Sequence, residues 1–218
     1  MSGRFVRDPY IGHVARWLKQ QGSQLTPDRA AAEAFLHSLD PQDERFSFRT
    51  FSDSGYTRHA SHDPLERALH GTLAECWDEL VALNQAGAVI TVTINRTHGA
   101  ARGIDDITHV RAVFVDDDRG VGRLALTPEP HLVVSTSPRH FHYYWRVSGM
   151  PLEDFSGLQQ RLAEHYQGDR KVQALNQSMQ LPGFWRRKRV THPRLPCLIE
   201  TRAGPPLDAR GVSRLLDG

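Results

Sequence analysis

The chain has 218 residues, of which 39% are hydrophobic and 24% are charged, an ordinary composition for a globular protein with a substantial core. Its formal net charge is only +2, from 27 Lys and Arg against 25 Asp and Glu, so an anionic partner must be bound by a local patch. Two cysteines exclude a disulfide scaffold, and the absence of a long apolar run or a signal-peptide core predicts a cytoplasmic protein with no membrane partner.

The first part of the chain predicts helices and one strand. Apolar residues recur with helical spacing at 11–18 and 32–39, and Thr26-Pro27 before the second helix resembles a cap with a first-turn proline. The alternating segment Phe46–Phe51 predicts a strand. A capping box, Thr72–Glu75, then opens a further helix.

The remainder predicts a sheet with flanking helices. Apolar, β-branched runs predict strands at 88–94, 110–115, 131–136 and 143–147. Residues 151–166 have the spacing of an amphipathic helix, residues 171–179 predict a short helix, and residues 197–201 predict a last strand. Asp208 is placed to cap a C-terminal helix.

The strand at 110–115 ends in three carboxylates. Side chains two apart on a strand point to the same face, so Asp116 and Asp118 should project together. Two neighbouring carboxylates repel each other unless a cation lies between them, and Mg²⁺ prefers such oxygen ligands. The pattern therefore predicts a metal pair. The alternative is that Asp-Asp-Asp-Arg-Gly is only a polar turn after the strand.

Polar residues also follow the two later strands. Ser135 and Ser137 end one strand, and His142 precedes the core of the next, so these side chains should meet the acidic pair at one edge. Together they describe a nucleotidyl-transfer site, in which His142 and Arg139 hold a triphosphate and the two serines supply hydroxyls or a turn of backbone N–H groups. The alternative for His142 is a strand histidine satisfied by its neighbours.

A basic run lies near the C-terminal end of the chain. Trp185 is followed directly by Arg186, Arg187, Lys188 and Arg189. Cations beside aromatic rings suit phosphate contact and base stacking, which predicts a DNA-binding segment. The alternative is a solvated basic surface.

Several motifs, in order, resemble the RepB-type primases of plasmids and phages, which belong to the archaeo-eukaryotic primase superfamily. The resemblance runs from about residue 34 to 201 and is carried chiefly by 110–118, 135–145 and 179–184. It implies an RRM-like α/β core with a mixed or antiparallel sheet and flanking helices. The implied organisation is one catalytic domain, 1–218, with an N-terminal helical part at 1–40, a core at 41–205 and a C-terminal tail at 206–218.

The resemblance also implies an activity. RepB-type primases use Mg²⁺ or Mn²⁺ and nucleoside triphosphates to synthesise primers on single-stranded DNA, some also extend them, and a replicative helicase is a candidate partner. The metal-binding Asp-x-Asp of the family matches Asp116 and Asp118, and its nucleotide-binding histidine matches His142.

This chain departs from the family pattern at two positions. The position that matches the family's third catalytic aspartate holds Ala174, and the position of the arginine in its Arg-Leu-Pro-Gly motif holds Gln180. A missing carboxylate would weaken a second metal and reduce activity. Asp169 or Asp117 could substitute, Ala174 could be an engineered inactivation, or the chain could be a DNA-binding replication module without efficient synthesis. A metal-dependent nuclease using the same carboxylates is a further alternative.

Overall fold

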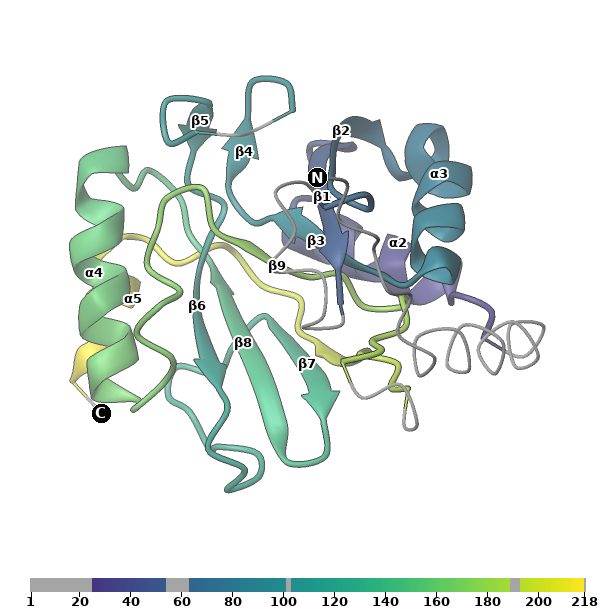
Figure 1. Ribbon diagram of the computed structural model, residues 1–218. Helices are drawn as coiled ribbons and strands as arrows, with labels where there is room; N and C mark the ends of the chain where they lie inside the picture. The colour runs from purple at the N-terminus through teal and green to yellow at the C-terminus, as the bar shows by residue number, and fades with distance from the viewer. Residues whose placement is uncertain (1–24, 54–62, 101–102, 189–192, 218) are drawn as a thin grey trace, which may run out of the picture.

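The computed structural model describes residues 25–53, 63–100, 103–188 and 193–217, which form two four-stranded antiparallel sheets with helices around them (Figure 1). The helices and strands are, in chain order, α2 (Arg29–Leu39), β1 (Arg45–Ser52), β2 (Arg67–Thr72), α3 (Leu73–Ala86), β3 (Ala88–Thr93), β4 (Arg96–Thr97), β5 (Ile107–His109), β6 (Ala112–Asp117), β7 (Leu132–Ser137), β8 (His140–Arg146), α4 (Leu152–His165), β9 (Ser178–Gln180), β10 (Cys197–Thr201), α5 (Ala209–Ser213) and the 3₁₀ helix η2 (Arg214–Leu216). The helix expected at 11–18 lies outside the described residues. None of the helices in the described ranges is both long and apolar enough to span a bilayer.

The first sheet has the strand order β2-β1-β3-β9 and packs one face against α3, while α2 contacts β10 and β7 of the second sheet. Phe46 and Phe48 of β1 point into this core and are almost fully buried. The predicted capping box is present at the start of α3, where the side chain of Thr72 accepts from the N–H of Glu75 and the carboxylate of Glu75 accepts from the N–H of Thr72. This box sets where β2 ends and the helix begins.

The start of α2 differs from the prediction. Its N-cap is Asp28, whose carboxylate accepts a 3.0 Å hydrogen bond from the N–H of Ala31, so the expected cap at Thr26 is wrong. Asp is as good a cap as Thr, and the N–H of Asp28 is itself held by the carbonyl of Gly183. A contact distant in sequence therefore selects between two suitable caps.

The second sheet has the order β10-β7-β8-β6, with Tyr143, Tyr144 and Trp145 of β8 fully buried at its centre. Helix α4 covers the free edge of β6. The amide of Gln159 accepts from the N–H of Phe114 at 3.2 Å and donates to its carbonyl at 2.5 Å. One side chain thus satisfies backbone groups that an edge strand leaves unpaired.

The short helix predicted at 171–179 is wrong. The N–H of Lys171 bonds to the carboxylate of Asp169, the N–H of Gln177 bonds to the carbonyl of Ala174, and β9 then pairs with β3. These turns and the pairing with a distant strand replace the helical hydrogen bonds, because local propensity is weak against tertiary contacts.

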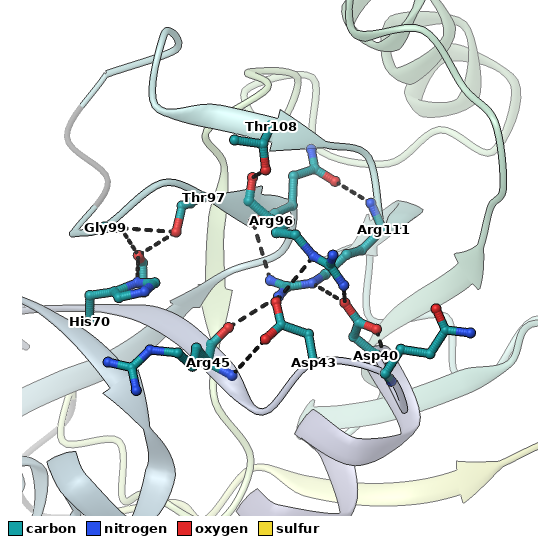
Figure 2. A network of polar contacts seen from close by, with 12 residues as sticks. Asp40, Asp43, Arg45, His70, Arg96, Thr97, Gly99, Thr108 and Arg111 are labelled. Atoms are coloured by element: carbon teal, nitrogen blue, oxygen red, sulfur yellow. Dashed lines mark hydrogen bonds and ion pairs between the residues drawn. The ribbon is translucent and has the colours of Figure 1, made fainter.

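A buried ion network ties the sheets together (Figure 2). Arg111 lies just before β6, and its guanidinium contacts Asp40 at 2.7 Å and Asp43 at 2.8 Å while it covers the ring of Phe46 at 4.4 Å. Arg96 shares the same two carboxylates. The network fixes the start of the strand that carries the acidic residues at its other end.

Candidate active site

The second sheet brings Asp116 and His142 together. They are opposite residues on β6 and β8, and Nε2 of His142 lies 3.3 Å from Oδ1 of Asp116. Nδ1 of the same imidazole lies 3.1 Å from the hydroxyl of Tyr144, which is fully buried. The contact with the carboxylate favours the tautomer that carries its proton on Nε2. Nδ1 is then the acceptor, and the Tyr144 hydroxyl donates to it. The histidine is therefore held in one orientation.

The two carboxylates have opposite electrostatic environments. Burial alone would raise the pKa of Asp116, but attraction by His142, with His140 and Arg186, lowers that pKa overall. Burial and the charge of Asp116 raise the pKa of Asp118. Asp118 therefore takes up a proton more readily than Asp116.

These features fit a divalent cation. Oδ1 of Asp116 is buried and, within the described part of the chain, accepts no well-aligned hydrogen bond despite its contact with His142. No group of three His, Cys, Asp or Glu side chains in the described ranges is arranged to hold a metal. Mg²⁺ is commonly bound by one or two carboxylates with phosphate and water oxygens completing the shell, which suits Asp116 and Asp118.

Asp117 does not share this position. It is fully buried, and Nε of Arg119 donates to it at 2.7 Å. Its place between Asp116 and Asp118 on an extended segment puts its side chain on the other face of the sheet. Asp117 is therefore committed to a structural ion pair.

Asp169 lies beside the acidic pair, although it follows Asp116 by 53 positions and Asp118 by 51 positions in the sequence. Its N–H donates a 2.8 Å hydrogen bond to the carbonyl of Asp116, and its charge contributes to the raised pKa of Asp118. The preceding residue is Gly168, where a Cβ would lie 3.0 Å from both the Asp116 carbonyl oxygen and a Val115 methyl group. A residue without a side chain permits this close approach.

The β7–β8 hairpin separates the two serines that the sequence places at the site. Ser135 is opposite Phe141 and so lies on the face away from His142. A register shift then sets Ser137 opposite His140, and its Oγ lies 2.9 Å from Nδ1 of His140. His140 is two residues from His142, on the same face, and its charge lowers the pKa of Asp116. The sequence assigns nucleotide binding to His142 and not to His140, for which the spacing His140-Phe141-His142 favours only a minor alternative, a shared transition-metal ion.

Arg139 occupies the tip of the hairpin. Its φ of 66° is in the left-handed region, which is unusual for a residue with a side chain. The side chain is exposed, and Nη2 lies 3.4 Å from the carbonyl of Val121 in the loop that follows the acidic residues. The guanidinium therefore lies at the rim of the site.

The basic run is only partly at the surface. Arg186 donates to the buried Asp53 at 3.0 Å, and Arg187 is 4% exposed with its guanidinium on the carbonyl of Gln85. The indole N–H of Trp185 bonds to the carbonyl of Thr26. Lys188 is exposed, and Arg189 lies outside the described residues.

Residues 68–196 match the family model of the RepB DNA-primase N-terminal domain. Curated protein sequences gave no significant match.

Three solved structures share the fold. The AEP domain of the cyanophage S-2L primase-polymerase has a TM-score of 0.64 at 17% identity, covering 88% of this chain and 99% of that one. Primase RepB' has a TM-score of 0.60 at 21% identity, and the aligned region covers 85% of this chain but only 61% of that one. The catalytic domain of RepB' in complex with initiator DNA has a TM-score of 0.58 at 20% identity, covering 86% and 94%. The expected α/β primase core with antiparallel sheets is confirmed.

Proposed function

The chain belongs to the RepB DNA-primase N-terminal domain family, and from this premise we propose that it is a DNA primase or primase-polymerase. Its substrates would be nucleoside triphosphates and a single-stranded DNA template, with a replicative helicase as a candidate partner. We further propose that residues 1–218 act as one catalytic domain. The observation that carries the proposal is the buried Oδ1 of Asp116, which lies 3.3 Å from His142 and, among the described residues, accepts no well-aligned hydrogen bond.

The proposed reaction is two-metal nucleotidyl transfer, in which a 3′-hydroxyl attacks the α-phosphorus and pyrophosphate leaves. Asp116 and Asp118 would hold Mg²⁺ or Mn²⁺. Such an ion, when bound, supplies neutralisation of phosphate charge and activation of the attacking hydroxyl. His142 is held by Tyr144 at Nδ1, and its Nε2 contacts Asp116 at 3.3 Å. With Asp116 engaged by the ion, the Nε2–H would be free to donate to a phosphate oxygen of the nucleotide.

We propose Asp169 as the third carboxylate. The resemblance assigns that role to the position of Ala174, which carries no ligand, whereas Asp169 is hydrogen-bonded to the backbone of Asp116. Its side chain is half-buried and its Oδ1 already accepts from the N–H of Lys171, which leaves the second oxygen for an ion. The reduced activity expected from Ala174 is then not a necessary consequence of that substitution.

The triphosphate would lie against the β7–β8 hairpin. Ser137 and Arg139 are at its tip, on the same edge as His142, and could bind phosphate oxygens as hydroxyl and guanidinium donors. Ser135 is proposed to contribute through its backbone rather than its hydroxyl, since its side chain lies on the other face. Of the basic run, Trp185, Lys188 and Arg189 remain proposed DNA contacts, with Arg186 and Arg187 supporting them from within the protein.

A primer-synthesis assay tests the proposal. The chain is incubated with single-stranded DNA and labelled ATP or dATP, with Mg²⁺ and Mn²⁺ in separate reactions. Asp116→Asn and Asp118→Asn should each lower product formation by at least about 100-fold, because metal binding contributes several kcal/mol to the barrier. The exposed Asp78→Asn on α3 is the matched control and should leave synthesis unchanged.

Other outcomes select other functions. DNA binding without product under either metal would favour a DNA-binding replication module. Cleavage of single-stranded DNA in the absence of nucleotide, lost in Asp116→Asn, would favour a nuclease.

A further inference from the structure

The face of the first sheet that lies opposite Phe46 and Phe48 carries a row of polar residues outside the catalytic edge. Arg49, Thr91 and Gln180 are directly opposite one another on β1, β3 and β9, which Figure 1 shows side by side. Phe46 and Phe48 point to the core, so the alternate positions Arg49 and Phe51 point to the opposite face. With adjacent strands about 4.8 Å apart, the row spans roughly 10 Å.

Two groups in this row lack partners. Within the described ranges, the half-buried side chain of Arg49 has no ion pair or hydrogen bond, although its backbone carbonyl accepts from the hydroxyl of Thr91 at 2.8 Å. The Nε2 of Gln180 is buried and, among the same described residues, has no hydrogen-bond acceptor. Partly buried donors without acceptors are costly, so an external acceptor is expected there.

An exposed aromatic ring lies next to these donors. Phe51 is 40% exposed and follows Arg49 by two residues on the same face. Its exposure is unusual for a residue of this size, and it is the one aromatic side chain among the large hydrophobic residues that are exposed in the described part of the chain. An aromatic ring beside phosphate-binding donors is the arrangement that proteins use for single strands of nucleic acid.

The strand that carries Arg49 and Phe51 is joined to the basic run. Asp53, two residues after Phe51, accepts from Nε of Arg186 at 3.0 Å. A nucleic acid lying over β1 would therefore come near the segment whose Trp185 and Lys188 are proposed DNA contacts. The β7–β8 hairpin already provides the proposed triphosphate position, so this second set of donors suits a DNA backbone phosphate.

We propose that Arg49, Phe51 and Gln180 form a binding row for single-stranded DNA, with Arg49 and Gln180 at a backbone phosphate and Phe51 stacked on a base. This inference rests on the proposed function for its ligand, although it concerns residues outside the catalytic edge. Single-strand binding by this row does not require that the chain synthesise primers.

Fluorescence anisotropy of a labelled oligothymidylate with the full chain tests the row without catalysis. Arg49→Gln should weaken binding by about tenfold and reduce the slope of log K against log salt by about 0.7, the value for one single-strand phosphate contact. Phe51→Ala should weaken binding by at least about fivefold, and Phe51→Tyr should restore it, because a tyrosine ring also stacks. Arg210→Gln on α5 removes the same charge from an exposed site and should have little effect.

A second arm measures binding of a fluorescent ATP analogue with Mn²⁺, which Arg49→Gln should leave within about twofold of the parent. The inference is overturned if Arg49→Gln and Phe51→Ala bind the oligonucleotide as the parent does, if the parent does not bind it, or if Arg49→Gln weakens only nucleotide binding. Loss of DNA binding in both variants of a chain that makes no primers would support the row while contradicting the proposed activity. Full primer synthesis with unaltered DNA binding in both variants would support the proposed activity and contradict the binding row.

Discussion

The N–H of Asp169 donates a 2.8 Å hydrogen bond to the carbonyl oxygen of Asp116, on the edge of β6 that faces away from β8. This bond fixes a carboxylate from the segment after α4 beside the Asp116–Asp118 pair. The acidic edge is therefore built from two segments of the chain rather than from one motif.

The role of Asp169 can be separated from that of position 174. Asp169→Asn keeps the backbone bond and an acceptor for Lys171 but removes the charge, so primer synthesis should fall by about 10- to 100-fold while Tm changes little. Ala174→Asp should leave the rate near that of the parent. A large gain in Ala174→Asp, with no loss in Asp169→Asn, would return the third carboxylate to position 174. Primer-synthesis rates and thermal melting of both variants provide the measurement.

Gly168→Ala should disturb the site through packing alone. The added Cβ would meet the Asp116 carbonyl oxygen and a Val115 methyl group at 3.0 Å, so we expect a loss of about 1–3 kcal/mol in unfolding free energy and a weaker response to Mn²⁺. Gly157→Ala is the matched control, since Gly157 lies in α4 with nothing within 4 Å of its Cβ position, and it should stabilise by about 0.5–1 kcal/mol. Urea unfolding with and without Mn²⁺ measures both effects. Equal stability of Gly168→Ala and the parent would refute the close approach.

Arg139 combines an unfavourable backbone conformation with a position at the rim of the site. Arg139→Gly removes the steric cost of its φ of 66° and should raise stability by up to about 1 kcal/mol, while KM for the nucleotide rises because a guanidinium is lost. Gln167→Gly is the control, because Gln167 has a φ of 54°, and it should gain stability without a change in KM. An unchanged KM in Arg139→Gly would remove Arg139 from the nucleotide site.

Asp118 should destabilise the metal-free protein at neutral pH. Its pKa in the folded state is raised by burial and by the charge of Asp116. Ionisation of Asp118 therefore lowers the free energy of unfolding as the pH rises from about 4, the unfolded pKa, through the folded pKa, and the loss is complete above that value. Asp118→Asn should therefore raise Tm at pH 7 without divalent metal by about 1–2 °C. Mn²⁺ should raise the Tm of the parent and have a smaller effect on the variant. A lower Tm for the metal-free variant would contradict this account.

Ionised Asp40 should stabilise the folded protein, whereas ionised Asp118 destabilises it. Burial opposes ionisation of Asp40, but hydrogen bonds from Arg96 and Arg111 lower its pKa overall. Its contribution is complete above the unfolded pKa of about 3.9 and is lost as the pH falls through the lower folded value. Chemical unfolding between pH 5 and 2 should show a smaller loss of stability in Asp40→Asn than in the parent, from a lower starting value. Parallel curves would show that the network in Figure 2 does not titrate.

Features that depend only on neighbouring residues can be predicted from the amino-acid order. The capping box at Thr72–Glu75, the amphipathic spacing of α4 and the apolar run that ends at Asp116 follow from periods of 3.6 and 2 and from local hydrogen bonds. The placement of Asp116 near His142 was also predictable, because both residues lie at strand ends in one family pattern.

The tertiary structure decided what depends on register and on approach between distant segments. The register shift in β7 puts Ser137, but not Ser135, on the face of His142, and the packing of Gly168 on β6 brings Asp169 to the site. The guanidinium of Arg187 points inward because the carbonyl of Gln85, in α3, accepts a hydrogen bond from its Nη1. A single residue of slip reverses the face of a strand, and the partner of a charge is set by packing, so neither can be derived from local pattern.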